Sequence, residues 1–207
     1  MGALPSDLAA SLRDALGLRR GIETGTLHGG GARLMGELFE SAVSIELSPE
    51  LATAAGQELA AVDNVEILQG DSRELLPTLV DAEQPTLYFL DGHWSGGETA
   101  GQEFECPVLG EVTALSAGHR DDCVVIDDAR LFTASPPPPH DPDKWPTIAE
   151  LFDALRTAKP GHHVTVLQDV VIAAPASVKP IVDEWGRHPP PDSAPPPRHG
   201  LLARLRG

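Results

Sequence analysis

The sequence predicts an α/β fold in which a mostly parallel sheet carries helices on both faces. Over most of the chain, short apolar runs alternate with segments of helical periodicity. Strands that alternate with helices are typical of βαβ units in a three-layer αβα arrangement. Near the end, residues 162–175 hold two apolar runs with only Gln168 and Asp169 between them. So short a connection joins antiparallel strands, so the sheet is expected to end in a hairpin.

The predicted elements begin with an amphipathic helix over residues 6–19. Its apolar residues Leu8, Leu12, Ala15 and Leu16 recur at helical spacing behind a Ser or Asp cap. The strands expected next are "GIET", "AVSIEL", "VEILQG", "TLYFLDG" and "CVVIDDA", and the helices between them are "ARLMGELFES", "PELATAAGQELAA", "SRELLPTLV" and "CPVLGEVTALSA". The segment "WPTIAELFDALRTAKP" predicts one more helix before the hairpin. The Pro-rich residues 134–146 form a loop, because proline fits neither a helix interior nor a strand ladder.

The composition disfavours several classes of partner. The 207 residues include 31 acidic and 15 basic side chains, which give a formal net charge of −16. Nucleic acids and anionic membrane surfaces are bound mainly through Lys and Arg, so neither is expected as a partner. Two cysteines provide no disulfide framework. No apolar run approaches the roughly 20 residues of a membrane span, and the start of the chain lacks a secretion signal, so a cytoplasmic protein is expected.

A glycine cluster follows the first predicted strand. The segment "ETGTLHGGG", residues 23–31, places Glu23 at the strand end and four glycines before the next helix. Glycines at this point permit a tight turn and a close approach of a ligand to the backbone, as in the nucleotide sites of open parallel sheets. Leu27 and His28 break the G-x-G-x-x-G spacing of dinucleotide sites. A nicotinamide-dependent dehydrogenase is therefore disfavoured.

Acids also end the second and third predicted strands. Glu46 follows Glu23 by 46 − 23 = 23 residues, where a carboxylate can accept hydrogen bonds from ribose hydroxyls. Asp71 ends the third strand, where it can accept a hydrogen bond from an adenine amine. A pyrophosphate site would use the N–H groups at a helix N-terminus and would not need three acidic side chains. The three acids therefore predict a cleft for an uncharged adenosine moiety.

These motifs resemble the class I S-adenosylmethionine-dependent methyltransferases. The resemblance covers residues 21–175 through "ETGTLHGGG", "SIEL", "GDS" and the terminal hairpin, and it departs from the commoner E-x-G-x-G-x-G pattern at Leu27. It implies a Rossmann-like, doubly wound, seven-stranded sheet with an antiparallel last strand. It also implies an N-terminal helix in residues 1–20, a methyltransferase-like domain in residues 21–176 and a Pro-rich tail in residues 177–207.

The resemblance also implies S-adenosylmethionine as the cofactor and a set of residues that bind it. Glu23 and Gly25 are placed near its methionine and ribose part, Glu46 on the ribose hydroxyls and Asp71 near the adenine. The full cofactor set is Glu23, Thr24, Gly25, His28, Gly29, Glu46, Asp71, Ser72 and Asp91.

Further acids follow the fourth and fifth predicted strands. Asp91 lies in "LDGHWSGG", and Asp127 and Asp128 lie in "VVIDDARLF". In a doubly wound sheet these positions border the same crevice, so the three carboxylates should converge. Convergent carboxylates repel one another unless they are protonated or bound to a cation, and oxygen ligands suit Mg²⁺, Ca²⁺ or Mn²⁺. The positions also resemble the Mg²⁺ ligands of metal-dependent sugar O-methyltransferases, although "DGHWSGGETA" departs from that group.

These observations together predict O-methylation of a small hydroxylated metabolite with the help of a divalent cation, most simply Mg²⁺. A cation on the acceptor hydroxyl would lower its pKa and orient it for in-line attack. Asp91 and His93 are the candidate catalytic residues, with His93 either taking the proton or ordering its turn. Trp94 and Arg130 are the candidate substrate contacts, with packing and a local salt bridge as the alternatives. The segment 95–101 is a candidate lid.

Two other functions stay open at this point. A metal-dependent hydrolase or hydroxylase-like enzyme would use the same acids to activate water and would not bind S-adenosylmethionine. A non-catalytic binding protein would bind the cofactor but would tolerate the loss of Asp91, His93 and Asp127. Glu98, Glu103 and Glu105 are expected to form a solvated segment. The sequence determines neither the acceptor nor whether the chain forms a homo-oligomer.

Overall fold

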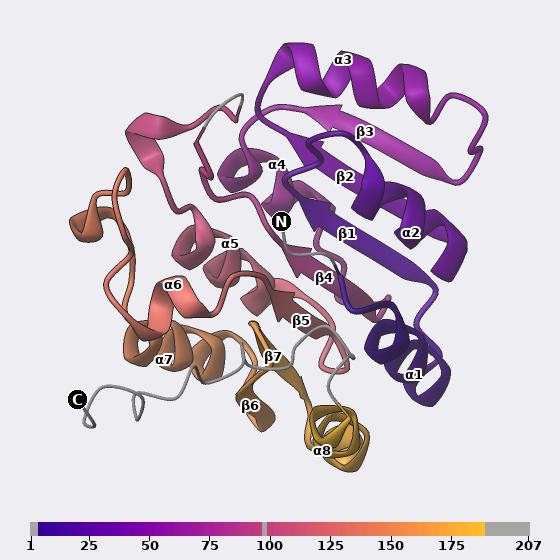
Figure 1. Cartoon of the computed structure of the whole chain (residues 1–207). Coiled ribbons are helices and arrows are strands. Elements are labelled where there is room, and N and C mark those ends of the chain that lie inside the picture. Colours follow the sequence, from indigo (N-terminus) through magenta and orange to yellow (C-terminus); the bar gives the residue numbers. More distant parts are fainter. Residues whose placement is uncertain (1–3, 97–98, 189–207) are drawn as a thin grey trace, which may run out of the picture.

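The computed structural model describes residues 4–96 and 99–188, and it confirms the predicted three-layer α/β architecture (Figure 1). Seven strands form one sheet in the order β3-β2-β1-β4-β5-β7-β6. Strands β1 to β5 pair in parallel, and β7 runs antiparallel to both β5 and β6. The strands are β1 (Arg20–Thr24), β2 (Ser41–Glu46), β3 (Val65–Gln69), β4 (Thr86–Leu90), β5 (Cys123–Ile126), β6 (His162–Leu167) and β7 (Val170–Pro175).

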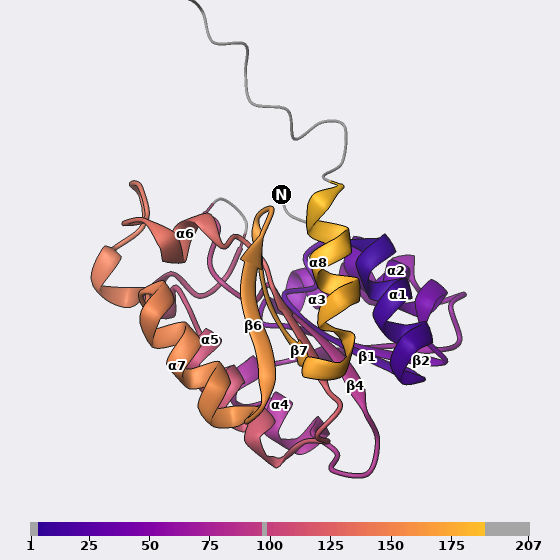
Figure 2. The same ribbon diagram turned by 90° about the horizontal axis from the view of Figure 1, so that it is seen from below.

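Helices cover both faces of this sheet, as the view along it shows (Figure 2). Helices α4, α5 and α7 contribute to the apolar core on one face, and α1, α2 and α8 contribute to the core on the other. The helices are α1 (Ser6–Leu16), α2 (Gly30–Leu38), α3 (Pro49–Glu58), α4 (Ser72–Leu79), α5 (Val108–Ala114), α6 (Arg130–Thr133), α7 (Ile148–Ala158) and α8 (Lys179–Arg187). In the described ranges, no helix is both long and apolar enough to cross a membrane.

The central strand β4 explains why its sequence is a continuous apolar run. Tyr88 and Leu90 point into the core with α4, α5 and α7, whereas Leu87 and Phe89 point into the core with α1, α2 and α8. All four side chains are buried. A parallel strand with helices on both faces has no solvent-facing side, so both sets of alternating positions are apolar. The chain leaves this strand at Asp91, at the edge where the acids were predicted to gather.

The terminal hairpin and the helix before it are confirmed. Strands β6 and β7 are joined at Gln168 and Asp169, and Gln168 has the positive φ of 54° that so tight a turn requires. Helix α7 begins with a capping box in which Thr147 and Glu150 exchange hydrogen bonds. At the other end of the chain, α1 ends at Leu16, earlier than predicted, because Gly17 adopts the left-handed conformation that terminates helices.

The segment after the sheet differs from the predicted tail. Residues 179–187 form helix α8, which packs beside α1, and its Trp185 Nε1 donates a hydrogen bond to Asp7 Oδ1 at 3.0 Å. Val182 lies in the same apolar core as Leu8. These contacts make α1 and α8 parts of one packed body with the sheet. The rest of the predicted tail, residues 189–207, lies outside the described residues.

Candidate active site

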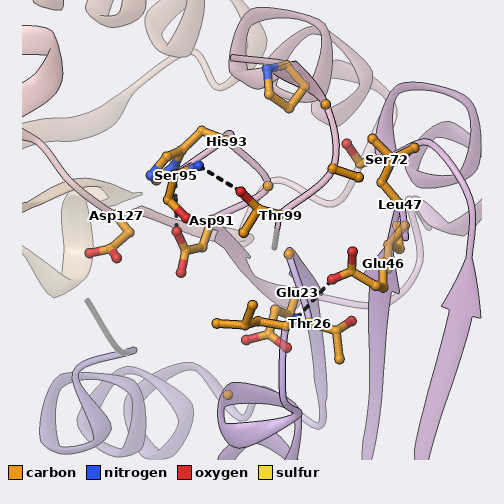
Figure 3. A pocket seen from close by; sticks show the side chains of 18 of the residues that line it. Glu23, Thr26, Glu46, Leu47, Ser72, Asp91, His93, Ser95, Thr99 and Asp127 are labelled. Carbon is orange, nitrogen blue, oxygen red and sulfur yellow. Dashed lines mark hydrogen bonds and ion pairs between the residues drawn. The ribbon is translucent and has the colours of Figure 1, made fainter. Parts of the chain in front are cut away.

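The carboxyl ends of the parallel strands border a cavity of about 330 Å³ (Figure 3). Figure 3 shows Glu46, Leu47 and Ser72 at one end of it, and Asp91, His93 and Asp127 at the other. The six acids that the sequence analysis singled out at strand ends all line this cavity: Glu23, Glu46, Asp71, Asp91, Asp127 and Asp128. The doubly wound topology thus brings together residues that are up to 105 positions apart, 128 − 23.

The turn after β1 requires its first glycine. Gly25 has a φ of 85°, and a Cβ atom there would lie 2.2 Å from the carbonyl oxygen of Asp91. The backbone N–H of Gly25 donates to Ile45 O at 2.9 Å. Gly25 therefore lets the turn after β1 lie directly against the chain that leaves β4. Leu27, at the departure from the commoner glycine pattern, also has a positive φ, of 49°.

Glu23 is buried under this turn. Ser44 Oγ donates a hydrogen bond to its Oε2 at 2.5 Å, and a Cβ atom on Gly31 would overlap its Oε1. Burial raises the pKa of Glu23 to about 8, against the lowering effect of the Ser44 hydrogen bond. A cation placed in the cavity would favour the ionised form of this carboxyl group.

Glu46 is held in one orientation at the wall of the cavity. Its Oε2 accepts a hydrogen bond from Leu27 N at 2.9 Å, and its Oε1 accepts one from Ser48 N at 2.9 Å. A carboxylate oxygen has two lone pairs, so each oxygen keeps capacity for one more donor. Two oxygens fixed in this way fit a pair of adjacent hydroxyl groups, such as those of a ribose.

Asp71 already has partners in this structure. It caps α4 by accepting from Arg73 N at 2.9 Å, and it pairs with the Arg73 guanidinium, whose Nη2 lies 2.6 Å from Oδ2. This hydrogen-bonded Arg73 lowers the pKa of Asp71. The contact of Asp71 with an adenine amine therefore stays a prediction in which the amine shares the carboxylate with Arg73.

Two apolar residues at this end of the cavity were not predicted from the sequence. Phe104 and Leu47 line it and are 60% and 42% exposed, and the Arg73 guanidinium lies 3.9 Å from the Phe104 ring centroid. Large exposed side chains beside a cavity are typical of surfaces that a ligand covers. Phe104 is an aromatic residue within the glycine-rich acidic segment "GGETAGQEFE" after β4, which was the available signal.

At the other end, His93 lies between two of the predicted acids. Its Nε2 is 2.9 Å from Asp128 Oδ2, and its Nδ1 is 3.6 Å from Asp91 Oδ1. Arg130 Nη1 donates to Asp128 Oδ1 at 2.5 Å and also pairs with Asp169. The prediction that the carboxylates meet at this edge is therefore correct, and the groups that balance their charge are an imidazole and a guanidinium.

The neighbouring charges shift the pKa values in this cluster. Burial would lower the pKa of His93, but the hydrogen bond with Asp128 and the charges of Asp91 and Asp127 outweigh it and raise the pKa. Burial raises the pKa of Asp91 to about 7, against the opposing influence of His93. Burial also raises the pKa of Asp127, whereas His93 and Arg130 outweigh burial and lower the pKa of Asp128. The cluster thus favours charged His93 and Asp128.

The arrangement does not fit the predicted magnesium site. Within residues 4–96 and 99–188, no group of three or more His, Cys, Asp and Glu side chains is placed to hold a metal ion. Asp91 and Asp128 surround the His93 ring, and Asp128 also pairs with Arg130. A cation would have to displace both partners of Asp128 to bind there. His93 and Arg130 relieve the charge repulsion that suggested a metal. His93 follows Asp91 by two positions, and Arg130 follows Asp128 by two positions.

The two candidate substrate contacts lie outside the cavity lining. Trp94 is buried and packs edge-on against His140, with ring centroids 5.5 Å apart. Arg130 joins Asp128 to Asp169 beside the β6–β7 turn. The alternatives of packing and a local salt bridge are therefore the roles that the structure shows.

Of the predicted cofactor set, Thr24 and Gly29 also lie outside the lining, whereas His28 and Ser72 are part of it. Thr24 is fully buried at the end of β1, and Gly29 is the left-handed N-cap residue of α2. Both shape the loop that carries the cavity wall.

One acid of the segment after β4 was assigned wrongly. Glu105 is only 2% exposed, whereas Glu103 is exposed as expected. Glu98 lies outside the described residues, as does part of the candidate lid. Within that segment, Ser95 N donates to Thr99 Oγ1 at 3.2 Å, and both residues line the cavity.

Comparison with known proteins supports the fold. No protein-family model matches the sequence, and no curated protein matches it. Among solved structures, the O-methyltransferase TomG from Streptomyces achromogenes, in complex with S-adenosylmethionine, is 20% identical with a TM-score of 0.58, over 83% of this chain and 79% of that one. The O-methyltransferase from Bacillus cereus, in complex with S-adenosylhomocysteine, is 18% identical with a TM-score of 0.58, over 82% and 79%.

A methyltransferase from Aquifex aeolicus, described as S-adenosylmethionine-dependent, is 18% identical with a TM-score of 0.53, over 82% of this chain and 92% of that one. At these identities the comparisons establish architecture. The chain has the Rossmann-like fold of the class I methyltransferases, as its sequence motifs predicted.

Proposed function

We propose that this protein is an S-adenosylmethionine-dependent methyltransferase that methylates a hydroxyl oxygen of a small molecule. The observation that carries the proposal is the Glu46 carboxylate, fixed by the backbone N–H groups of Leu27 and Ser48 at the wall of the cavity. It stands at the end of β2, in a fold shared with cofactor-bound O-methyltransferases. Its two oriented oxygens suit the ribose hydroxyls of the cofactor.

The charge of the cavity supports the same proposal. S-adenosylmethionine supplies a methyl group on a positively charged sulfonium, which makes that methyl electrophilic. Glu23 lines the cavity between its two ends, and Asp91 lines it at the His93 end. Their carboxyl groups stabilise a neighbouring positive charge, and the Gly25 turn admits the ligand close to the backbone. These residues bind and orient the cofactor.

The acceptor hydroxyl is placed at the end with Asp91, His93 and Asp127. Asp127 is buried, lines the cavity and receives no side-chain hydrogen bond from another residue in the described ranges. Its carboxylate has a backbone hydrogen bond from Asp128 and keeps further lone pairs that can accept a hydrogen bond from the acceptor. The acceptor oxygen would form a bond to the methyl carbon as the carbon–sulfur bond breaks, and its proton would pass to the Asp91 carboxylate, whose pKa burial raises to about 7. The sulfur keeps the electron pair of the broken bond.

The same charges indicate which acceptors fit. Arg73 pairs with the cavity acid Asp71, and Arg130 pairs with the cavity acid Asp128 and with Asp169. A phosphate or carboxylate on the acceptor would meet acidic side chains, and in residues 4–96 and 99–188 the two arginines beside those acids are already paired. We therefore propose a neutral or cationic hydroxylated small molecule as acceptor, and neither a nucleic acid nor a membrane surface as partner.

The test of the cofactor proposal is calorimetric titration of S-adenosylhomocysteine into the parent protein and into Glu46→Gln. We expect the variant to bind about 10- to 100-fold more weakly, since about 1.4–2.8 kcal/mol is typical for a polar pair left unmade. A glutamine NH₂ at that position would oppose a backbone N–H. Glu66→Gln, an exposed residue of β3, is the matched control and should bind like the parent. Absence of binding to the parent protein would refute the proposed function and favour a hydrolytic role for the acids.

A second titration tests the predicted magnesium site. We expect MgCl₂ to give no saturable heat with the parent protein, because His93 and Arg130 already neutralise Asp128. Removal of divalent cations with a chelator should therefore leave S-adenosylhomocysteine binding unchanged. A saturable Mg²⁺ signal that disappears in the double variant Asp127→Ala, Asp128→Ala would contradict this expectation and restore the metal-assisted mechanism.

A further inference from the structure

Two segments that are far apart in the sequence are joined by one buried carboxylate. Residues 91–107 connect β4 to α5, and residues 134–147 connect α6 to α7. Glu105 in the first segment accepts hydrogen bonds from Trp145 Nε1 at 2.9 Å and from Asp141 N at 3.1 Å, both in the second. Its carboxylate is therefore the centre of the contact between them.

A histidine and a lysine of the second segment complete this contact. His140 Nδ1 lies 3.4 Å from Glu105 Oε2, and Lys144 Nζ lies 3.7 Å from Oε1. Lys144 Nζ also donates to Gln102 O at 2.9 Å. A carboxylate is expensive to bury unless charged partners and hydrogen bonds satisfy it, and here all of these come from residues 140–145. The sequence expectation of a solvated Glu105 failed because these donors arrive from 35 or more positions away, 140 − 105.

Trp145 contacts both Glu105 and His93, and it therefore connects Glu105 to the lining of the cavity. Its indole is buried, and its ring centroid lies 5.1 Å from that of His140, 5.7 Å from that of Phe132 and 5.3 Å from that of His93. The contact with His93 is edge-on, a preferred geometry for such ring pairs. The indole N–H is fixed by Glu105 while the ring packs against the imidazole. A rotation of the indole would therefore change the space available to His93.

We propose that Glu105 is a positioning residue for His93 and acts through Trp145. Asp91 and Asp128 hold the two nitrogens of His93, and Trp145 supplies the apolar wall that fixes the plane of the ring. Glu105 fixes Trp145 in turn, so the acceptor end of the cavity is organised by a residue that does not line it. The assignment of His93 to methyl transfer rests on the proposed function. The positioning itself is independent of it.

The test is the NMR signal of the His93 ring, identified by its loss in His93→Gln. An indole beside an imidazole displaces the imidazole C–H signals through its ring current, so the displacement reports the geometry of the pair. We expect Glu105→Ala to lose this displacement. Glu105→Gln, which keeps an oxygen for Trp145 Nε1, should retain most of it. Glu103→Gln, an exposed acid of the same segment, is the matched control and should retain all of it.

The alternative is that Glu105 only stabilises the fold. Glu105→Ala would then lower the Tm but leave the His93 signal of the folded protein at its parent position, and this result would overturn the proposal. If Glu105→Ala does not fold, Glu105→Leu decides, because it fills the buried space, keeps the Trp145 indole and removes the acceptor of its N–H. A displaced His93 signal in that variant supports the proposal, and an unchanged one overturns it. The measurement needs no cofactor, so failure of S-adenosylhomocysteine binding remains a separate result.

Discussion

Gly25→Ala is expected to eliminate measurable S-adenosylhomocysteine binding and to destabilise the fold by more than about 2 kcal/mol. The positive φ of 85° alone costs a non-glycine residue about 1–2 kcal/mol. The added Cβ would also lie 2.2 Å from the carbonyl oxygen of Asp91, which is backbone and cannot rotate away. The turn after β1 and the chain after β4 would have to separate, and both border the cavity.

Calorimetric titration and thermal unfolding measure the two effects of this change. Gly56→Ala in α3 is the control, because a Cβ atom there meets nothing within 4 Å and alanine is favoured over glycine in a helix by about 0.5–1 kcal/mol. We expect this control to bind S-adenosylhomocysteine like the parent and to unfold at an equal or higher Tm. A Gly25→Ala variant that bound with parent affinity would show that the two segments do not need this close contact.

Lys159→Met is expected to lower the free energy of unfolding by about 3–5 kcal/mol, the usual loss when one partner of a buried ion pair is removed. Lys159 Nζ lies 2.6 Å from Asp122 Oδ2, and both side chains are almost completely buried. Asp122 Oδ1 also accepts from Thr86 N at 2.9 Å, so the carboxyl group cannot leave its place at the start of β4. Burial without a partner raises the pKa of the Asp122 carboxyl group in the folded state of the variant. The loss of unfolding free energy should therefore grow as the pH rises.

Denaturant unfolding at several pH values checks this expectation. The control is Lys179→Met, which removes the surface pair with Asp183 and should cost less than about 1 kcal/mol. Adding Asp122→Asn to Lys159→Met should recover part of the lost stability, because the amide keeps an oxygen for Thr86 N without a buried charge. Equal losses of unfolding free energy in Lys159→Met and Lys179→Met would contradict the expectation that the buried pair contributes more than the surface pair.

The mostly parallel sheet could be predicted because each strand is a short apolar run between helical segments. The continuous run in β4 required burial on both faces, and the hairpin at Gln168 and Asp169 required antiparallel strands. Helix α8 was not predicted because prolines are typical of extended segments, whereas Pro180 lies in the first turn of the helix, where proline is tolerated. The apolar residues behind it are Ile181, Val182 and Trp185. These three residues have helical spacing and pack against α1 and its core.

The positions of the acids in the candidate site could be predicted from the sequence, but their side-chain partners could not. Topology places Asp91 and Asp128 at one edge of the sheet, and periodicity is enough to find both. The spacing does not show that His93 lies between them or that Arg130 folds back onto Asp128. Trp145 reaches His93 from 52 positions away, 145 − 93, through a proline-rich segment without helical or strand periodicity. Such side-chain pairing depends on tertiary packing.

The acid lining of the cavity also bears on turnover. On the proposed function, the sulfur carries a positive charge in the substrate form of the cofactor and none after the methyl group has left. Glu23 and Asp91 attract the charged form and lose that attraction once the sulfur is neutral. If the proposed function holds, transfer of the methyl group would remove this attraction, and the two forms of the cofactor would meet the same acidic lining with different charges.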